Sequence, residues 1–227
     1  ATEATGFLTN PDVSVLPLFL IMASLASAAG VAEDVYRIAQ ALFGHLKGGL
    51  AMATIGGCAG FGAVTGSSIA TVATIGRVAL PQMKARGYGT TLSTGSVAAG
   101  GTLGSAVPPS GGLVVYAFLT ETSLGQLFMA AMIPAAIAVL FYLILIGIWV
   151  RVSPRTIPSQ EEFSWPETIK AFRKGLAVFG LFTLVMGGIY FGWFTVAEAA
   201  SVGAVYAFFI AYFRGKLKGD AFWKTMG

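Results

Sequence analysis

Long apolar stretches without a charged side chain alternate along the chain with short polar segments. Five such uncharged runs cover residues 13–32, 48–76, 87–120, 122–150 and 175–197. Each is at least as long as the roughly 18 residues that mark a candidate transmembrane helix. Hydrophobic residues make up 56% of the sequence and charged residues 11%, whereas an ordinary soluble domain carries about 25% charged residues. The pattern therefore predicts an all-α polytopic membrane protein.

Residues 1–46 predict one membrane span followed by an amphipathic helix. The span covers Val13–Gly30, after an Asn10-Pro11 pair typical of a helix cap followed by proline at the first helical position. From Val31 to Leu46 apolar residues recur at helical spacing. Such a helix fits the membrane interface, and it equally fits a helix packed on protein. Its polar face would hold Glu33, Asp34, Arg37 and Gln40.

Residues 47–87 are predicted to form a re-entrant helical hairpin rather than one straight span. Its half-helices would cover Gly49–Val64 and Ser67–Met83, with a turn at residues 65–68. The turn is favoured because it places the flanking basic residues on one membrane face, as the positive-inside rule expects. These basic residues are Lys47, Lys84 and Arg86.

The rest of the chain is predicted to alternate between the two membrane faces. Its segments are a broken transmembrane helix at 88–120, a scaffold span at 121–156, a cytoplasmic amphipathic arm at 157–174 and two further spans at 175–227. The break falls near Pro108-Pro109, and Pro134 is expected to bend or end the scaffold span locally. Capping boxes are predicted for Ser123 with Gln126, Ser164 with Glu167, and Thr195 with Glu198.

The charge distribution supports this topology and argues against nucleic-acid binding. The outer segments, residues 1–12, 119–124 and 191–198, contain no Lys or Arg. The net charge of +4 therefore belongs to short loops at one membrane face. The polar first residues predict no signal peptide, and the absence of an initiator Met predicts a fragment of a longer chain. An aromatic belt is predicted from Trp149, Trp165, Trp193 and Trp223, which fall near segment ends.

Two glycine-rich stretches, residues 56–68 and 100–112, interrupt their apolar segments and carry the candidate chemistry. Glycine pairs and a Pro-Pro free backbone groups that hydrocarbon cannot satisfy, so such breaks line a cavity or are buried in protein. Carbonyls at the end of a half-helix coordinate small cations such as Na+, and the N–H groups at the start of its partner attract a carboxylate. Neither stretch contains Asp, Glu or Lys, and neutral oxygens suit a monovalent cation better than Mg2+ or a transition metal. The candidate residues are Gly66, Ser67, Ser68, Thr102, Gly104, Ser105, Pro108, Pro109 and Ser110.

Other interpretations of these glycines remain open at this point. The pairs Gly56/Gly60, Gly62/Gly66 and Gly100/Gly104 have the spacing of close helix packing, which would suit a membrane scaffold without transport. Gly66-Ser67-Ser68 also faintly resembles the nucleophile turn of a serine hydrolase, but the single histidine, His45, lies near a predicted membrane face. Cys58, the single cysteine, permits no internal disulfide and is expected at a helix contact. No enzyme activity is therefore expected.

The sequence resembles the large membrane subunit of tripartite ATP-independent periplasmic (TRAP) transporters. The resemblance rests on GSSIATVATIGRVALPQMKARGY and GTLGSAVPPSGGLVVYAFLTETSLGQLFMAAMIP, together with LPLFLIMASLASAAG and GGIYFGWFTVAEAA. It extends from Leu16 to Tyr212 and covers roughly the central half of a typical member, the first of two inverted repeats and the start of the second. Val196 stands where the family often has proline.

The resemblance implies an elevator-type secondary transporter of the bacterial inner membrane that imports an organic anion with Na+. The substrate would be a dicarboxylate, a sialic acid or a similar carboxylate, delivered by a periplasmic binding protein. A small four-helix membrane subunit would complete the complex, with no organic cofactor and no metal besides Na+. The implied Na+ site comprises Gly66, Ser67, Ser68, Gly101, Thr102, Gly104 and Pro108, and the implied substrate site comprises Ser67, Ser105, Pro109 and Ser110.

Overall fold

The computed structural model describes residues 15–153 and 165–216, and these are almost entirely helical. The helices are α2 (Val15–Ala28), α3 (Val31–Phe43), α4 (Gly49–Thr65), α5 (Ser68–Ala85), α6 (Thr90–Ala106), α7 (Gly111–Thr120), α8 (Leu124–Val152), α9 (Trp165–Phe182), the π-helical turn η2 (Thr183–Gly187), α10 (Gly188–Tyr190) and α11 (Val196–Phe213). The predictions for Asn10-Pro11, the Ser164 cap and Trp223 fall outside the described residues.

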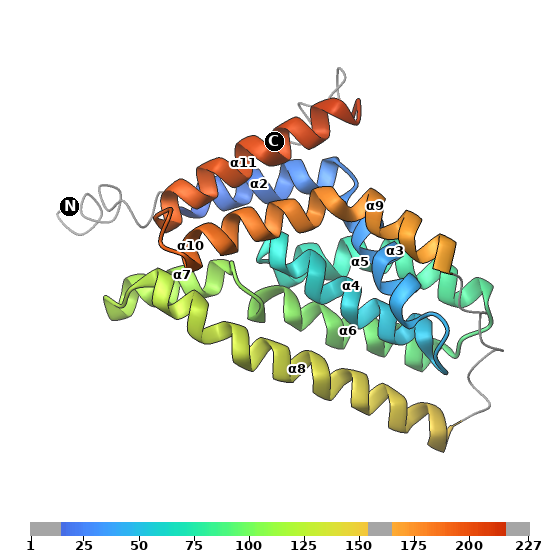
Figure 1. Ribbon diagram of the computed structural model, residues 1–227. Helices are drawn as coiled ribbons and strands as arrows, with labels where there is room; N and C mark the ends of the chain where they lie inside the picture. The colour runs from blue at the N-terminus through green and yellow to red at the C-terminus, as the bar shows by residue number, and fades with distance from the viewer. Residues whose placement is uncertain (1–14, 154–164, 217–227) are drawn as a thin grey trace.

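The helices have the lengths and composition of a multi-pass membrane protein. Among the described residues, four segments are long and apolar enough to span a membrane, or up to five if the bent α2–α3 pair counts as one. The four are Thr90–Thr120, Leu124–Val152, Thr168–Tyr190 and Val196–Phe213. In Figure 1 the α3–α4 turn, the α5–α6 turn and the end of α8 lie on one side of the molecule, opposite the α7–α8 and α10–α11 turns. The segments that carry Lys47, Lys84, Arg86 and Arg151 thus lie on one side, as the charge argument expects.

The chain does not run straight through residues 48–76 but turns between α4 and α5. Gly66 ends α4 with φ at 61°, a left-handed conformation that glycine adopts without steric cost. Ser67 is extended and caps α5, where its hydroxyl accepts the Ala70 N–H. The observed helix bounds lie within two residues of those expected. That both helices enter the same membrane face stays a prediction.

Glycine residues allow neighbouring helices to pack closely against α4. A Cβ at Gly62 would lie 2.6 Å from the Gly104 Cα, and one at Gly100 would lie 2.9 Å from the Cys58 sulfur. Cys58 of α4 is fully buried against Gly100 of α6, so it occupies the helix contact that the sequence predicts. The glycine spacing therefore serves helix packing, and the same packing brings the two breaks together.

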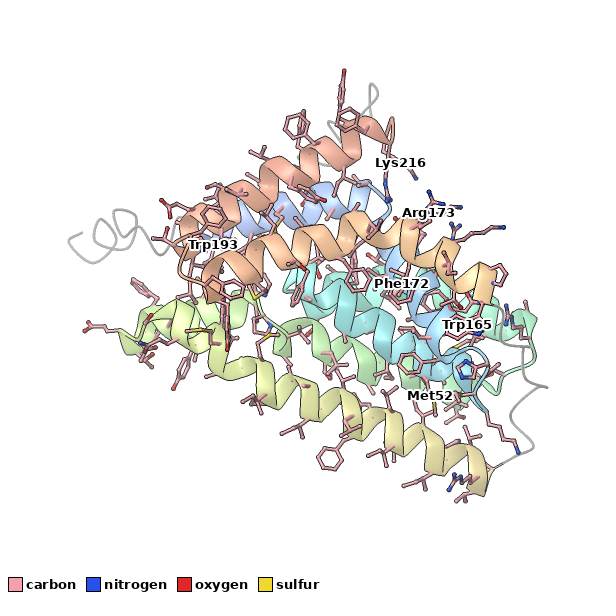
Figure 2. All side chains as sticks on the ribbon, viewed as in Figure 1. Met52, Trp165, Phe172, Arg173, Trp193 and Lys216 are labelled. Carbon is pink, nitrogen blue, oxygen red and sulfur yellow. The ribbon has the colours of Figure 1, made fainter. Side chains whose placement is uncertain are left out.

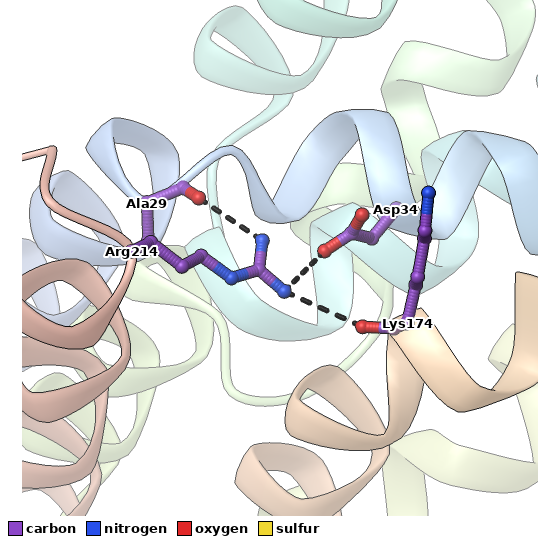
Figure 3. Close-up of polar contacts among 4 residues, drawn as sticks. All are labelled: Ala29, Asp34, Lys174 and Arg214. Atoms are coloured by element: carbon purple, nitrogen blue, oxygen red, sulfur yellow. Dashed lines mark hydrogen bonds and ion pairs between the residues drawn. The ribbon is translucent and has the colours of Figure 1, made fainter.

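α3 packs on protein, and its buried face differs from the predicted one at Asp34. The helix lies against α4 and α9 through residues such as Val35 and Ile38. Asp34, expected on the polar face, is buried and forms an ion pair with Arg214 at the end of α11. The Arg214 guanidinium also donates to the Ala29 carbonyl at 3.1 Å and the Lys174 carbonyl at 3.4 Å, as Figure 3 shows. One side chain thus joins the α2–α3 corner, α9 and α11.

Two expectations for α8, a helix end at Pro134 and a capping box at Ser123, are not met. Pro134 does not end the helix, which runs for 29 residues from Leu124 to Val152 with the proline inside it; Figure 1 shows one long helix along an edge of the molecule. Neighbouring turns of a long membrane helix accommodate a single proline because only one backbone donor is lost. Ser123 occupies the N-cap position, but its side chain makes no capping hydrogen bond.

The second part of the chain begins with a helix that crosses the predicted arm boundary. α9 runs without interruption through Lys174 and Gly175. Gly175 is a packing position, since a Cβ there would lie 2.1 Å from Ile38 Cδ1. The predicted capping box at Thr195 and Glu198 is confirmed, with Thr195 N donating to the Glu198 carboxylate at 2.8 Å. Figure 2 shows Trp165 and Trp193 near opposite ends of the α9–α10 segment, the placement that an aromatic belt requires.

Candidate functional site

The turn between α4 and α5 forms one half of the candidate site. The Gly66 N–H donates to the Gly62 carbonyl at 2.7 Å in the last turn of α4. The Thr71 N–H donates to the Ser67 carbonyl at 3.0 Å. The Ser67 hydroxyl is occupied by the Ala70 N–H at 3.3 Å. We call residues 66–68 the hairpin tip. Helix termini of this kind expose carbonyls on one side of the turn and N–H groups on the other.

The break between α6 and α7 forms the other half. α6 ends at Ala106 and α7 begins at Gly111, with a cis peptide bond between Pro108 and Pro109. In a continuous helix the carbonyls of Gly104 and Ser105 would accept N–H groups from residues 108 and 109, but proline has none. These two carbonyls are therefore available to another electropositive group. We call residues 107–110 the proline break.

The hairpin tip and the proline break touch each other. The Gly111 N–H donates to the Gly66 carbonyl at 3.4 Å. A Cβ at Gly66 would lie 2.3 Å from the Pro109 carbonyl oxygen, and one at Gly104 would lie 2.7 Å from the Ser67 carbonyl oxygen. Gly101 belongs to the same contact, since a Cβ there would overlap the Val72 side chain of α5. The structure thus brings Gly66, Ser67, Gly101, Gly104, Pro109 and Ser110 into one neighbourhood.

A chain of hydroxyl groups runs from the hairpin tip along α6. Ser68 Oγ donates to Ser105 Oγ at 2.8 Å, and Ser105 Oγ donates to the Thr102 carbonyl at 3.1 Å. Thr102 Oγ1 donates to the Ala99 carbonyl at 2.7 Å. Each hydroxyl has one proton and two acceptor lone pairs. The protons of all three hydroxyls are already donated, so their oxygens can act only as acceptors toward a further partner. Such oxygens suit a cation.

Ser110 differs from these hydroxyls because its proton is unused. Ser110 is 1% exposed, caps α7 and makes no side-chain capping bond. Its Oγ atom is buried without a hydrogen-bond partner. A buried hydroxyl left unpaired costs about 1–3 kcal/mol, so a ligand that accepts its proton would recover that free energy. The position at the start of α7 also favours an anion.

Sequence reasoning placed Thr65 in the turn but missed several residues that lie near it or near α6. Thr65 and Thr71 pair through their hydroxyls at 3.3 Å directly behind it. Ser24 and Ser27 of α2 line a pocket of about 420 Å³ together with Thr65 and Ser67. The hydroxyl oxygen of Tyr142, in α8, lies 3.1 Å from Thr102 Oγ1. Thr65 belongs to the predicted turn, and Thr71, one helical turn after Ser67, had a local signal. Ser24, Ser27 and Tyr142 had none, because they come from distant helices.

The charge of the site is carried by backbone and hydroxyl dipoles alone. Across residues 15–153 and 165–216, no three His, Cys, Asp or Glu side chains gather where they could hold a metal ion. His45 precedes α4 and Ser67 follows it. A helix of 17 residues separates them by about 25 Å. His45 is therefore too distant to serve Ser67 as a general base.

Nearly the whole chain matches one protein family. The family described as "Tripartite ATP-independent periplasmic transporter, DctM component" matches residues 4–226. The C4-dicarboxylate TRAP transporter large permease protein DctM of Vibrio cholerae is 39% identical over 212 residues, which cover 93% of this chain and 46% of that protein. The protein of the same name from Pseudomonas aeruginosa is 41% identical over 198 residues, which cover 87% of this chain and 46% of that protein.

A relative with a different named cargo is the ectoine TRAP transporter large permease protein TeaC of Halomonas elongata. It is 32% identical over 197 residues, which cover 87% of this chain and 46% of that protein. The chain spans about half the length of these curated relatives. The family and its relatives are membrane transport subunits and not enzymes, which removes the serine hydrolase alternative.

Proposed function

Because the chain belongs to the DctM component family of tripartite ATP-independent periplasmic transporters, we propose that it is the core of a Na+-coupled permease subunit that imports an organic carboxylate. The whole protein lies in the bacterial inner membrane and moves its site by a rigid-body elevator step. The observation that carries the proposal is the contact between the hairpin tip and the proline break. In a membrane, two interrupted helices meeting in this way form a binding site from backbone groups.

The cation half of the proposed site is formed by acceptor oxygens. The Gly104 and Ser105 carbonyls have no helical donor, and the Ser68 and Thr102 hydroxyls have already donated their protons. Such a set of neutral oxygens suits Na+ better than a divalent or transition metal. The coupling ion therefore binds on the side of the tip that faces α6, bounded by Gly66, Ser67, Ser68, Gly101, Thr102, Gly104 and Pro108.

The anion half is formed by the start of α7 and the serines around it. Ser110 holds an undonated proton beside the first N–H groups of α7, and both favour a carboxylate oxygen. Ser67, Ser105 and Pro109 complete this side. The named cargoes of the relatives, a C4-dicarboxylate and ectoine, both contain carboxylate groups. A carboxylate substrate is delivered by a periplasmic binding protein, and a small four-helix membrane subunit completes the complex.

Ser110→Ala tests this function in the full-length protein. Uptake of radiolabelled succinate is measured in proteoliposomes that contain the permease with its small membrane subunit and receive succinate-loaded binding protein under an inward Na+ gradient. We expect uptake to fall about tenfold or more, because a hydrogen bond to a charged group contributes roughly 1.5–3 kcal/mol. The melting temperature without substrate should stay the same or rise, since the variant removes a buried unpaired hydroxyl.

Ser93→Ala is the matched control. Ser93 is also buried and lies in α6, but its hydroxyl donates to the carbonyl of Gly89, the N-cap of that helix, at 3.0 Å. Uptake by this variant should remain near that of the wild type. Equal uptake by both serine variants, or wild-type uptake that is indifferent to replacing Na+ with K+, would contradict the proposed function.

A further inference from the structure

Tyr142 places a hydroxyl group in the middle of an otherwise apolar helix. Between Gln126 and Arg151 it is the only residue of α8 that carries a hydroxyl. It lies ten residues, or about 15 Å, before the end of α8 at Val152, which corresponds to the middle of a hydrocarbon core about 30 Å thick. An unpaired hydroxyl at this depth is costly. Its partner is therefore informative about the role of the helix.

The partner of Tyr142 is Thr102, one of the proposed cation-site residues. Tyr142 lies on the face of α8 that also holds the buried Ile146 and Val150, and its oxygen is 3.1 Å from Thr102 Oγ1. Thr102 has a single hydroxyl proton, which it donates to the Ala99 carbonyl at 2.7 Å. The proton in the contact between the two side chains must then come from Tyr142.

This donation fixes the direction in which Thr102 presents its oxygen. One lone pair of Thr102 Oγ1 accepts from Tyr142, and one remains. Thr102 is one helical turn before Ser105 and receives the Ser105 proton on its carbonyl. The Thr102 side-chain oxygen is thus held by two hydrogen bonds, one to its own helix and one to α8. Without the Tyr142 proton, one of these two hydrogen bonds is lost and the oxygen is held less firmly.

We propose that Tyr142 is a positioning residue for the coupling cation, acting through Thr102 from outside the hairpin and the proline break. The proposal rests on the cation site proposed above and adds to it a residue of the long helix α8. Tyr142 does not touch the ion. It orders the Thr102 hydroxyl and so lowers the Na+ concentration that the transporter requires.

The test compares Tyr142→Phe with wild type in the reconstituted full-length complex, with succinate uptake measured over a range of Na+ concentrations. We expect the Na+ concentration for half-maximal uptake to rise two- to tenfold, the range that corresponds to loss of one hydrogen bond. The maximal rate should fall by less than this factor. A purely structural role would lower the maximal rate and the melting temperature without a selective shift in Na+ dependence.

Two further variants separate the possible outcomes. In a Thr102→Ala background, Tyr142→Phe should produce less than a twofold additional shift, because its effect passes through Thr102. Tyr212→Phe removes a hydroxyl from an exposed tyrosine of α11 and should change nothing. An unaltered Na+ dependence in Tyr142→Phe, when wild-type uptake does require Na+, overturns this inference alone. Wild-type uptake that does not depend on Na+ overturns both this inference and the proposed function.

Discussion

Replacing Arg214 by glutamine is expected to destabilise the protein by about 3 kcal/mol, the lower end of the range for breaking a buried ion pair. Arg214 is partly exposed, at 28%, but its partner Asp34 is only 9% exposed. The substitution leaves the Asp34 carboxylate in the protein without its counter-charge, and it also removes the donor to the Ala29 carbonyl. Thermal unfolding of the detergent-solubilised full-length protein measures the loss.

The matched control for this prediction is Arg173→Gln. Arg173 is an exposed residue of α9 on the same side of the molecule as Lys216 in Figure 2, so its loss should cost well under 1 kcal/mol. Asp34→Asn in the Arg214→Gln background should recover part of the stability, because no charge is then buried. Similar melting temperatures for the two single arginine variants would show that the ion pair contributes little.

The Asp34–Arg214 pair also shows what the sequence could not predict. Helical spacing placed Asp34 on the polar face of its helix, and that assignment is locally correct for an isolated amphipathic helix. The partner lies 180 positions later in the chain and reaches Asp34 only because α11 packs along α2. Periodicity records which face of a helix is apolar, but it does not record which distant helix covers that face.

The helix breaks, in contrast, were predictable because their causes are local. Glycine at 66 and proline at 108 and 109 act through φ preference and the missing N–H, whatever surrounds them. The residues that complete the site were not predictable for the opposite reason. Ser24, Ser27 and Tyr142 come from α2 and α8, and no spacing in the sequence links these helices to the hairpin tip.

The helices α8 and α9 each continue through a residue of low helix propensity. Pro134 and Gly175 are weak helix formers in water, so local propensity alone favours a helix end at Pro134 and weakens the helix at Gly175. In the folded protein both lie within continuous helices. Backbone hydrogen bonding within a membrane helix outweighs a single unfavourable residue, and Gly175 gains a close contact with Ile38.

Gly104→Ala is expected to abolish Na+-driven uptake, because one methyl group at this position forces α5 and the hairpin tip away from the end of α6, which leads into the proline break. The added Cβ would lie 2.5 Å from Thr71 Oγ1 and 2.7 Å from the Ser67 carbonyl oxygen. The Ser67 oxygen belongs to the backbone, so the strain is relieved only by moving α5 or the tip. We expect uptake of radiolabelled succinate in proteoliposomes to fall at least a hundredfold.

Gly95→Ala provides an unusually close comparison, because Gly95 lies in the same helix and has nothing within 4 Å of an added Cβ. Both substitutions raise helix propensity by about 1 kcal/mol, so a difference between them reports the contact at residue 104. Gly95→Ala should transport at the wild-type rate. Size-exclusion chromatography shows whether Gly104→Ala is misfolded. If the variant is folded with a displaced tip, Na+ should no longer raise its melting temperature. Wild-type uptake by Gly104→Ala would mean that close approach of the two breaks is not required, and the site built on that approach would be wrong.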